Sequence, residues 1–420
     1  MSTRAAWVVV ILVIGLWCGP TVGDESDWQP MTCWTTRSLM DVWGSGPNDV
    51  YIVGEKDIGP LPVYHYDGSA WLPLMDGPEL TVDLHGIWGS GPNDIFAVGE
   101  EGTIVYYNGS AWSEMTSGAD GSFNDVWGSG PNDVYAVGER WWPDEFPVYH
   151  YDGSTWSMAT GPEMIDELYA VWGSAPNDVF AVGQLGTILH YDGSAWSEAT
   201  TGIWLFDVWG SAPNDVFTVG ELWMPLWFPM YHYDGSTWSS VEGPLLESDL
   251  DGIWGSGPND VFAVGHSGTI VRYGGASWSE MSSGSSKRLN AVWGSGRYDV
   301  FAVGDDGTVL HYSPLYALTV TINDEQRGAV TADPNLPSYP GGTPVTLTGE
   351  PNEGSSFNKW KMHDPLDANN DYTDTNNPTT LVMDRDWEVK AAFKCGSELG
   401  PMLPMILVGL GMFAVVRRRG

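Results

Sequence analysis

Positive charge is scarce in this chain. Its 420 residues include 17 Lys and Arg against 54 Asp and Glu, which gives a formal net charge of −37. A surface with this excess of carboxylates repels phosphate backbones, so we expect no nucleic-acid partner. A soluble extracellular or salt-adapted surface accounts for the same charge without any specific function.

Cysteine is scarce as well, with three residues in the whole sequence. Cys18 lies in an N-terminal apolar segment, and Cys33 and Cys395 lie in different segments further on. The sequence therefore does not indicate a structural disulfide.

Common catalytic motifs are also missing. The sequence contains no nucleophile elbow, no zinc-ligand spacing and no phosphate-binding loop. We therefore expect that the protein is not an enzyme and that it needs no cofactor.

A repeated phrase organises the chain. A sequence close to W-G-S-[GA]-P-N-D-V-[FY]-x-V-G recurs at intervals of 45, 39, 45, 37, 45 and 39 residues. Its first residue is Trp43, Trp88, Trp127, Trp172, Trp209, Trp254 and Trp293. A period near 40 residues, rich in short alternating apolar runs, is typical of a four-stranded β-propeller blade. The predicted fold class is all-β, with a seven-bladed propeller over residues 27–313.

One repeat illustrates the predicted blade. Leu168–Gly173, Asp178–Gly183, Thr187–Tyr191 and Ala195–Ala199 are rich in Val, Ile, Phe, Tyr and Trp, as strands require. Turn residues separate these runs. The seventh copy lacks the last run, whereas residues 27–31 match it and lie before the first copy. We therefore predict that residues 27–31 form the outer strand of blade seven and close the ring, which removes an open sheet edge.

Insertions make copies one, three and five longer than the others between their second and third strands, and those of copies three and five are rich in aromatic residues. The connections between blades vary as well and include Trp204. Aromatic side chains in loops on a rigid scaffold suit stacking against sugars or anchoring a protein partner. The candidate ligand-binding residues are Trp141, Trp142, Phe146, Trp204, Trp223, Trp227 and Phe228. The same side chains could instead pack over the face as a lid, and this alternative stays open.

Two chemical alternatives also remain. Glu139, Asp144, Glu145 and Glu221 are the loop carboxylates nearest these aromatics, so a glycosidase-like carboxylate pair in the central funnel is the alternative to a binding protein. A His recurs at one repeat position, and we interpret such a recurring group as scaffold. These residues are His65, His150, His190, His232 and His311, with Tyr106 and Arg272 at the same position in other copies.

The repeat phrase resembles the W-G-S-x-P-N-D-V-x-A-V-G repeats of secreted proteins from myxobacteria and other deltaproteobacteria. The resemblance spans residues 27–313 and implies a β-propeller without an established activity. We expect the propeller to be monomeric.

Residues 316–394 lose the repeat and resemble the divergent InlB B-repeat family of bacterial surface proteins. The matching phrases include L-T-V-T-I at 318–322, Y-P-G-G-T at 339–343, F-N-K-W at 357–360 and A-A-F at 391–393. The resemblance implies a small β-grasp-like stalk domain without catalysis. A polar insertion in it carries a weak calcium-loop pattern, at Asp367, Asn369, Asp371 and Asp374. Tyr372 and Pro378 stand where such a loop needs Gly and Glu, so a plain polar loop is the simpler interpretation.

Both ends of the chain carry predicted targeting signals. Residues 1–23 combine Arg4, an apolar run and a small-residue cleavage region, as a secretory signal peptide does. Residues 395–420 combine Cys395, an apolar stretch from Leu399 to Val416 and the basic cluster Arg417, Arg418 and Arg419. This tail resembles the C-terminal sorting signals of myxobacterial and related surface proteins, in which the helix is removed and the Cys is implicated in attachment. An ordinary transmembrane anchor is the alternative.

These patterns together predict an exported, non-enzymatic binding or adhesion protein that is tethered to the cell surface through its C-terminus. An extracellular polysaccharide or a surface protein is the expected partner. A purely structural envelope component is a further alternative.

Overall fold

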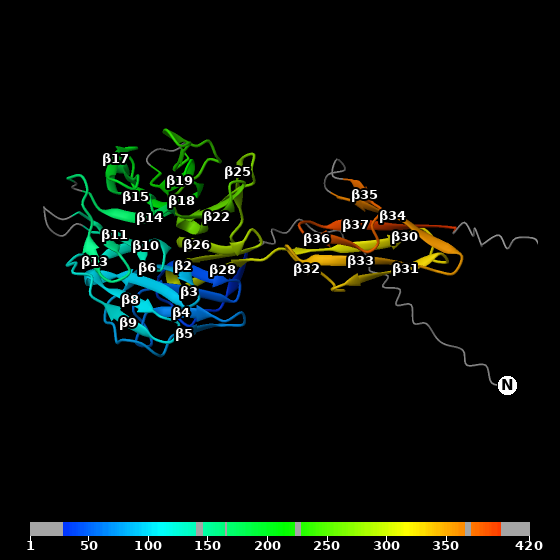
Figure 1. Cartoon of the computed structure of the whole chain (residues 1–420), viewed down its shortest axis with the longest axis horizontal. Coiled ribbons are helices and arrows are strands. Elements are labelled where there is room, and N and C mark those ends of the chain that lie inside the picture. Colours follow the sequence, from blue (N-terminus) through cyan, green and yellow to red (C-terminus); the bar gives the residue numbers. More distant parts are fainter. Residues whose placement is uncertain (1–27, 140–145, 164–165, 223–227, 366–370, 396–420) are drawn as a thin grey trace, which may run out of the picture. The chain divides into compact units, whose positions relative to one another are not determined.

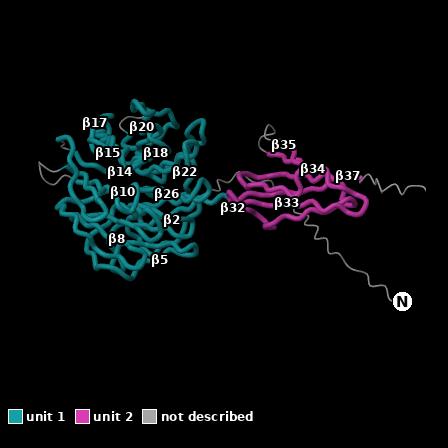
Figure 2. The backbone as a smooth tube through the Cα atoms, viewed as in Figure 1, with its two compact units in different colours: residues 1–314 teal, residues 315–420 magenta. Residues whose placement is uncertain are grey.

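The computed structural model describes residues 28–139, 146–163, 166–222, 228–365 and 371–395. The chain divides into two compact units, Met1–Pro314 and Leu315–Gly420 (Figure 2). Among the described residues, no helix has the length and apolarity needed to cross a membrane. The predicted signal peptide 1–23 and the predicted apolar helix 399–416 lie outside the described residues.

The first unit consists of seven four-stranded sheets, each with its strands in antiparallel order from the inside outwards (Figure 1). We number these blades along the chain. Blades 1 to 3 are β2 (Leu39–Gly46), β3 (Asp49–Gly54), β4 (Val63–Tyr66), β5 (Trp71–Pro73); β6 (Leu84–Gly91), β7 (Asp94–Gly99), β8 (Ile104–Tyr107), β9 (Trp112–Met115); and β10 (Phe123–Gly130), β11 (Asp133–Gly138), β12 (Val148–Tyr151), β13 (Trp156–Met158). Blades 4 to 6 are β14 (Leu168–Ala175), β15 (Asp178–Gly183), β16 (Thr187–Tyr191), β17 (Trp196–Thr200); β18 (Leu205–Ala212), β19 (Asp215–Gly220), β20 (Met230–Tyr233), β21 (Trp238–Ser240); and β22 (Leu250–Gly257), β23 (Asp260–Gly265), β24 (Ile270–Tyr273), β25 (Trp278–Met281). The predicted strands of the fourth repeat agree with β14 to β17 to within two residues.

Blade 7 is assembled from both ends of the first unit. It contains β26 (Leu289–Gly296), β27 (Asp299–Gly304), β28 (Thr308–Tyr312) and, as its outer strand, β1 (Trp28–Met31). Strand β1 pairs antiparallel with β28, with Trp28 opposite Tyr312 and Met31 opposite Val309. The predicted closure of the ring by an N-terminal strand is therefore confirmed.

The tryptophan of each repeat phrase packs on a glycine of the following blade. A Cβ atom added to that glycine would lie 2.5 to 2.8 Å from the indole, closer than any real side chain approaches. The seven contacts are Trp43 on Gly89, Trp88 on Gly128, Trp127 on Gly173, Trp172 on Gly210, Trp209 on Gly255, Trp254 on Gly294 and Trp293 on Gly44. The last of these joins blade 7 to blade 1, so the same contact runs around the whole ring.

A second set of tryptophans interlocks the blades from the opposite direction. The first residue of each outer strand is a Trp that meets, edge to face, an aromatic ring on the second strand of the preceding blade. Ring centroids lie 5.9 to 6.5 Å apart in Trp28–Phe262, Trp71–Phe301, Trp112–Tyr51, Trp156–Phe96, Trp196–Tyr135, Trp238–Phe180 and Trp278–Phe217. Such pairs contribute about 0.5–1.5 kcal/mol beyond the area that they bury. Fourteen repeated tryptophans are thus used by the scaffold.

Long and short blades alternate, and the difference has a structural cause. The insertions of blades 1, 3 and 5 place Leu61, Phe146 and Phe228 in cores shared with blades 2, 4 and 6. The other four blades replace the insertion by a single 3-10 turn: η1 (Glu100–Gly102), η2 (Gln184–Gly186), η3 (His266–Gly268) and η4 (Asp305–Gly307). The repeat intervals therefore reflect three blade pairs and one further blade.

The second unit has two main sheets around one core. One sheet has the order β30 (Leu318–Ile322), β37 (Trp387–Cys395), β34 (Ser355–His363) and β35 (Tyr372–Asp374); the other has β31 (Gly328–Asp333), β33 (Pro344–Pro351) and β36 (Thr379–Val382). A short pair, β29 (Leu315–Tyr316) and β32 (Tyr339–Pro340), accompanies them. Trp360, Leu347 and Val389 from the two sheets share the core. The sequence predicts a β-grasp-like domain. The regular secondary structure in the described part of this unit consists of strands, and its first and last long strands, β30 and β37, pair in parallel.

The contact between indole and glycine can be tested with two glycines of the same strand. A Cβ at position 128 would lie 2.7 Å from the Trp88 ring and 2.8 Å from the Asp133 carbonyl oxygen, whereas nothing lies within 4 Å of a Cβ at position 130. We expect Gly128→Ala to lower the free energy of unfolding by about 1–3 kcal/mol because the indole has no free space to move into. Gly130→Ala should change it by less than about 0.5 kcal/mol. Urea denaturation of both variants measures this, and equal losses would refute the packing argument.

Candidate functional site

The recurring polar residues form a network within each blade. In blade 4, Ser174 Oγ donates to Asp178 Oδ2 at 2.5 Å, and His190 Nε2 lies 2.7 Å from Asp178 Oδ1. The His190 ring stacks on Phe180 with centroids 4.1 Å apart. The residues are those of a serine–histidine–aspartate triad, but the aspartate stands in the middle, so the serine has no general base. This order of contacts supports a scaffold role.

The same network recurs around the ring. The His–Asp pairs are His65–Asp49, His150–Asp133, His190–Asp178, His232–Asp215 and His311–Asp299, with Tyr106–Asp94 and Arg272–Asp260 in the remaining blades. A group that occurs in every blade ties the second strand to the third and does not single out a site.

Three carboxyls on the inner strands distinguish blades 1, 3 and 5. Asp41 accepts the backbone N–H of Val42 and, at 2.8 Å, that of Ile87 in blade 2. Asp125 does the same with Val126 and with Val171 of blade 4, and Asp207 with Val208 and with Ile253 of blade 6. Both oxygens of each carboxyl are therefore occupied, and each carboxyl links the two blades of a pair.

These carboxyls have unusual proton affinity. Burial raises the pKa of Asp41 to about 7 and that of Asp207 to about 8. The pKa of Asp125 is also raised, first by burial and then by the charges of Asp41 and Asp207. Within the described residues, no group of three or more His, Cys, Asp and Glu side chains could hold a metal ion. The three carboxyls are thus structural links between blades, and ionising them in their buried positions lowers the stability of the fold.

A group of aromatic side chains around Trp204 lies outside the repeated tryptophan positions and is partly exposed to solvent. Trp204 lies between β17 and β18 and is 37 % exposed. The Tyr169 ring, on β14, lies 6.1 Å from Trp204 and 6.0 Å from Phe206 on β18. We call Tyr169, Trp204 and Phe206 the aromatic cluster. It lies where blades 4 and 5 meet, on the face that also carries the connections between blades.

A polar group borders the aromatic cluster. The Tyr169 hydroxyl donates to Glu167 Oε2 at 3.4 Å. Burial and the neighbouring Glu167 carboxylate raise the pKa of Tyr169 to about 12, so the hydroxyl keeps its proton at neutral pH. The cluster thus combines ring faces with a hydrogen-bonding edge, which is the usual composition of a small-ligand or sugar site.

Of the predicted ligand-binding residues, the structure exposes Trp204. Phe146 and Phe228 are 6 % and 8 % exposed, and their rings pack against Trp196 and Trp278 at 6.2 and 5.7 Å. These two rings belong to the core, where they fill the space between the paired blades. Trp141, Trp142, Trp223 and Trp227 lie outside the described residues.

Sequence reasoning missed three aromatics. Trp34, between β1 and β2, is 64 % exposed and occupies neither repeated tryptophan position. Its position outside the repeat is a signal by which the sequence could have indicated Trp34, as it indicated Trp204. Tyr169 and Phe206 follow the first residue of an inner strand, where the repeat varies in any case, and the sequence gives no such signal for them.

The remaining candidate residues are spread over both units. Asp371 Oδ1 lies 2.7 Å from His363 Nδ1, and Asp374 Oδ2 accepts the Thr379 hydroxyl, while Asp367 and Asn369 lie outside the described residues. Of the loop carboxylates, Glu139 accepts the Ser122 N–H at 3.4 Å, and Asp144 and Glu145 lie outside the described residues.

The two cysteines of the described chain are free thiols. Cys395 is exposed at the end of β37, whereas burial raises the pKa of Cys33 to about 11. Arg417, Arg418 and Arg419 lie outside the described residues.

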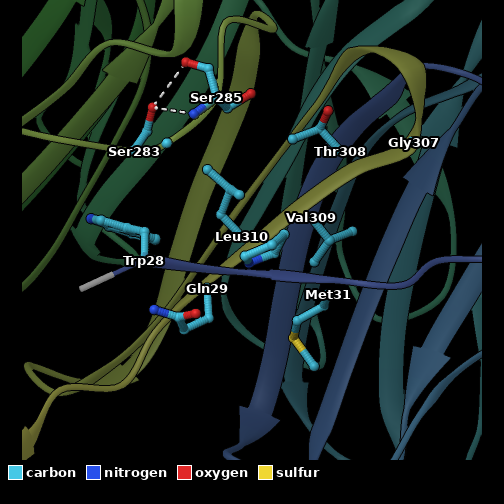
Figure 3. A pocket seen from close by; sticks show the side chains of 11 residues that line it. Trp28, Gln29, Met31, Ser283, Ser285, Gly307, Thr308, Val309 and Leu310 are labelled. Carbon is cyan, nitrogen blue, oxygen red and sulfur yellow. Dashed lines mark hydrogen bonds between the residues drawn. The ribbon is translucent and has the colours of Figure 1, made fainter. Parts of the chain in front are cut away.

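A groove of about 630 Å³ runs beside the closing strand (Figure 3). Trp28, Gln29 and Met31 line one side and the turn Ser283–Ser285 the other, where Ser285 N–H donates to Ser283 Oγ. Its lining contains no ionisable side chain, so it offers no acid or base for catalysis.

Comparisons with known proteins support both folds. Residues 318–397 match the family model of the divergent InlB B-repeat domain. The chain is similar to the solved structure "YCF48 bound to D1 peptide", with 16 % identity, a TM-score of 0.53, and 69 % of this chain and 96 % of that chain covered. YCF48 from Cyanidioschyzon merolae matches at 15 % identity and TM-score 0.53 (68 % and 98 % covered), and the WD40 propeller domain of Doa1 at 12 % and 0.54 (67 % and 94 %). At these identities the likeness is one of fold, the β-propeller. No protein of curated function matches the chain.

The raised pKa values of the three inner-strand carboxyls predict a pH dependence of stability. An unfolded Asp has a pKa near 3.9, and the folded pKa of Asp207 is about 8. The folded state binds the extra proton between these values, so this group lowers stability as pH rises from about 4 to about 8. Asp207→Asn should remove the contribution of Asp207 to this pH dependence. The difference in free energy of unfolding between the variant and the wild type should therefore change by more than about 1 kcal/mol across this range, because one pKa unit corresponds to about 1.4 kcal/mol. Urea midpoints between about pH 5 and about pH 8 measure the difference.

Asp67→Asn is the control. Hydrogen bonds from Ser69 and Ala70 lower the pKa of this exposed carboxyl to about 2, so its stabilising effect is lost only as pH falls towards that value. Its profile between about pH 5 and about pH 8 should run parallel to that of the wild type. If the Asp207→Asn profile does so as well, Asp207 is not protonated in the folded state as described.

Proposed function

We propose that this chain is a non-enzymatic binding protein of the cell surface, whose propeller presents the aromatic cluster to an extracellular polysaccharide. The observation that supports this proposal most is that Trp204 is exposed beside Tyr169 and Phe206. The fourteen repeated tryptophans, by contrast, pack between blades. An indole held on a closed ring is ordered before the ligand arrives, so little conformational entropy is lost on binding. Sugar rings stack on such faces, and the Glu167 edge is placed to accept hydrogen bonds from sugar hydroxyls.

Charge narrows the class of ligand. The chain carries a net charge of −37, and the described residues around the cluster include Glu167 and Asp166. A polyanion would be repelled from this face, so the ligand of the cluster is a neutral polysaccharide.

A protein partner is the second candidate. The similar propeller YCF48 has been solved bound to the D1 peptide, so a propeller of this kind can bind a peptide. Exposed Trp and Tyr side chains are also common anchors in protein interfaces.

The cellular setting follows from the ends of the chain. Export through residues 1–23 and tethering through residues 395–420, with Cys395 and the Arg cluster, would place a monomeric propeller at the cell surface. The second unit, as a divergent InlB B-repeat domain, would serve as its stalk.

The test is binding of the purified full-length chain to arrays of neutral glycans and of peptides, with Trp204→Ala as the variant. Leu72→Ala is the matched control, because Leu72 is 47 % exposed on the outer strand of blade 1 and lies outside the cluster. We expect Trp204→Ala to weaken glycan binding by about tenfold or more, since a central aromatic anchor contributes 2 kcal/mol or above. Leu72→Ala should bind like the wild type.

Urea unfolding of both variants provides the folding control. If Trp204→Ala binds neutral glycans as well as the wild type does, the cluster is not the site. Binding to peptides alone would replace the polysaccharide by the second candidate.

A further inference from the structure

Lysine is concentrated in one place in this acidic chain. Of its six lysines, four lie on two neighbouring strands of the second unit: Lys359 and Lys361 on β34, and Lys390 and Lys394 on β37. The two strands pair antiparallel, and their register sets Lys361 directly opposite Lys390. Like charges opposite each other destabilise a sheet. The sequence has 54 acidic residues with which these lysines could have been paired, so their placement calls for a cause outside sheet stability.

The lysines share the outer face of the sheet. Trp360 and Met362 on β34, and Val389 and Ala391 on β37, point into the core. Because side chains alternate along a strand, Lys359, Lys361 and Lys390 point to the opposite side. We call these three residues the lysine face. Their ammonium groups can lie about 5 Å apart across strands and about 7 Å apart along one strand, which is the scale of successive charges on a linear polymer.

The lysine face forms no ion pair within the described chain, although the exposed Glu388 of β37 lies on the same side of the sheet. The ion pairs of the second unit join Arg327 to Asp324, His363 to Asp371, and Arg385 to Asp364 and Asp384. None of the ion pairs formed between described residues involves Lys359, Lys361 or Lys390. Three ammonium groups beside one carboxylate, that of Glu388, leave a positive excess on this face of a chain whose net charge is −37, and such an excess attracts anions.

A groove runs along this face. It has a volume of about 560 Å³, and the lysine face lines it together with hydroxyls from Thr319, Thr321 and Thr373 and the ring of Tyr372. Tyr372 is 46 % exposed. His363 and Asp371 pair at one part of the lining, with His363 Nδ1 2.7 Å from Asp371 Oδ1, and so neutralise each other there. The lining also includes the Glu388 carboxylate, which the three lysines outnumber. It therefore offers ammonium groups for the acidic groups of a ligand, hydroxyls for sugar hydroxyls and one ring face for stacking.

We propose that the lysine face of the second unit is a binding site for an anionic polysaccharide, one that carries uronate or sulfate groups. The groove is open and crosses several strands, so it fits an extended chain better than a compact molecule. Duplex nucleic acid is disfavoured because its dense phosphates would meet the acidic remainder of the protein. This site is distinct from the aromatic cluster and takes an anionic ligand, whereas the cluster takes a neutral one. The protein would then contact two kinds of surface polymer, one through each unit.

The test is binding of the purified full-length chain to three polymer probes: polygalacturonic acid, dextran sulfate and neutral dextran. We expect the two anionic probes to bind and the neutral one not to bind to this site. The affinity should fall steeply between about 0.05 M and about 0.5 M salt, because exposed charges are screened over that range. The double variant Lys361→Gln/Lys390→Gln should lose about tenfold or more in affinity, since two charge-assisted contacts are removed.

The matched control removes the same charge elsewhere. Lys287→Gln/Arg297→Gln also deletes two positive charges, but from the propeller, where Lys287 pairs with Asp306 and Arg297 lies over Tyr298. It should bind the anionic probes within about twofold of the wild type, because only long-range, screened charge changes. Lys361→Arg/Lys390→Arg keeps the charge and should retain binding. The Gln double variant should unfold at the same or a higher urea concentration, because it relieves a like-charge pair.

Several outcomes would overturn the proposal. Equal loss in the Gln variant and in the propeller control would mean that net charge alone matters. Unchanged binding in the Gln variant, or binding of anionic phosphatidylglycerol vesicles in preference to both anionic polymers, would rule out a polysaccharide site here. Trp204→Ala should leave anionic binding intact, so a failure of the neutral-glycan proposal and a failure of this one are distinguishable.

Discussion

The packing of an indole on a glycine of the next blade is the contact on which the propeller depends. It requires Trp and Gly next to each other in every inner strand, since each blade supplies a Trp to its successor and a Gly to its predecessor. The outer tryptophans add an edge-to-face contact in the reverse direction. Both sets also join blade 7 to blade 1, through Trp293 on Gly44 and Trp71 on Phe301. Strand β1 supplies the missing outer strand of blade 7, and its Trp28 makes the contact with blade 6. Closure removes the exposed edges, and loops on such a ring are held by a rigid base.

Repetition explains why so much of the propeller could be predicted from sequence. The strands, their turns and the closing strand depend on contacts made in every blade, so each appears several times in the sequence. The insertions do not repeat in this way, and aromatic content alone could not tell a buried ring from an exposed one. Phe146 and Phe228 fill the space between paired blades, whereas Trp204, outside any insertion of that kind, is exposed. The links through Asp41, Asp125 and Asp207 escaped prediction because their partners are backbone N–H groups of the following blade.

The second unit contrasts with the first in what its sequence reveals. Its family resemblance predicted a small β domain. The lysine face could not be predicted, because Lys361 and Lys390 are 29 positions apart and become neighbours only through the register of β34 with β37. The two units also differ in surface chemistry: one exposes aromatic rings beside carboxylates, and the other exposes unpaired ammonium groups. A protein with both surfaces is suited to hold polymers of different charge.

The central claim is that the tryptophans at repeat positions build the propeller ring, whereas Trp34 and Trp204, which lie in the propeller outside those positions, do not. Trp28 and Trp34 are six residues apart, yet the first is 1 % exposed and the second 64 %. The most direct measurement is the free energy of unfolding of Trp28→Ala and of Trp34→Ala. The account predicts a loss of about 3–5 kcal/mol for Trp28→Ala, from the cavity beside Phe262, and less than about 0.5 kcal/mol for Trp34→Ala. Equal losses in the two variants would contradict it.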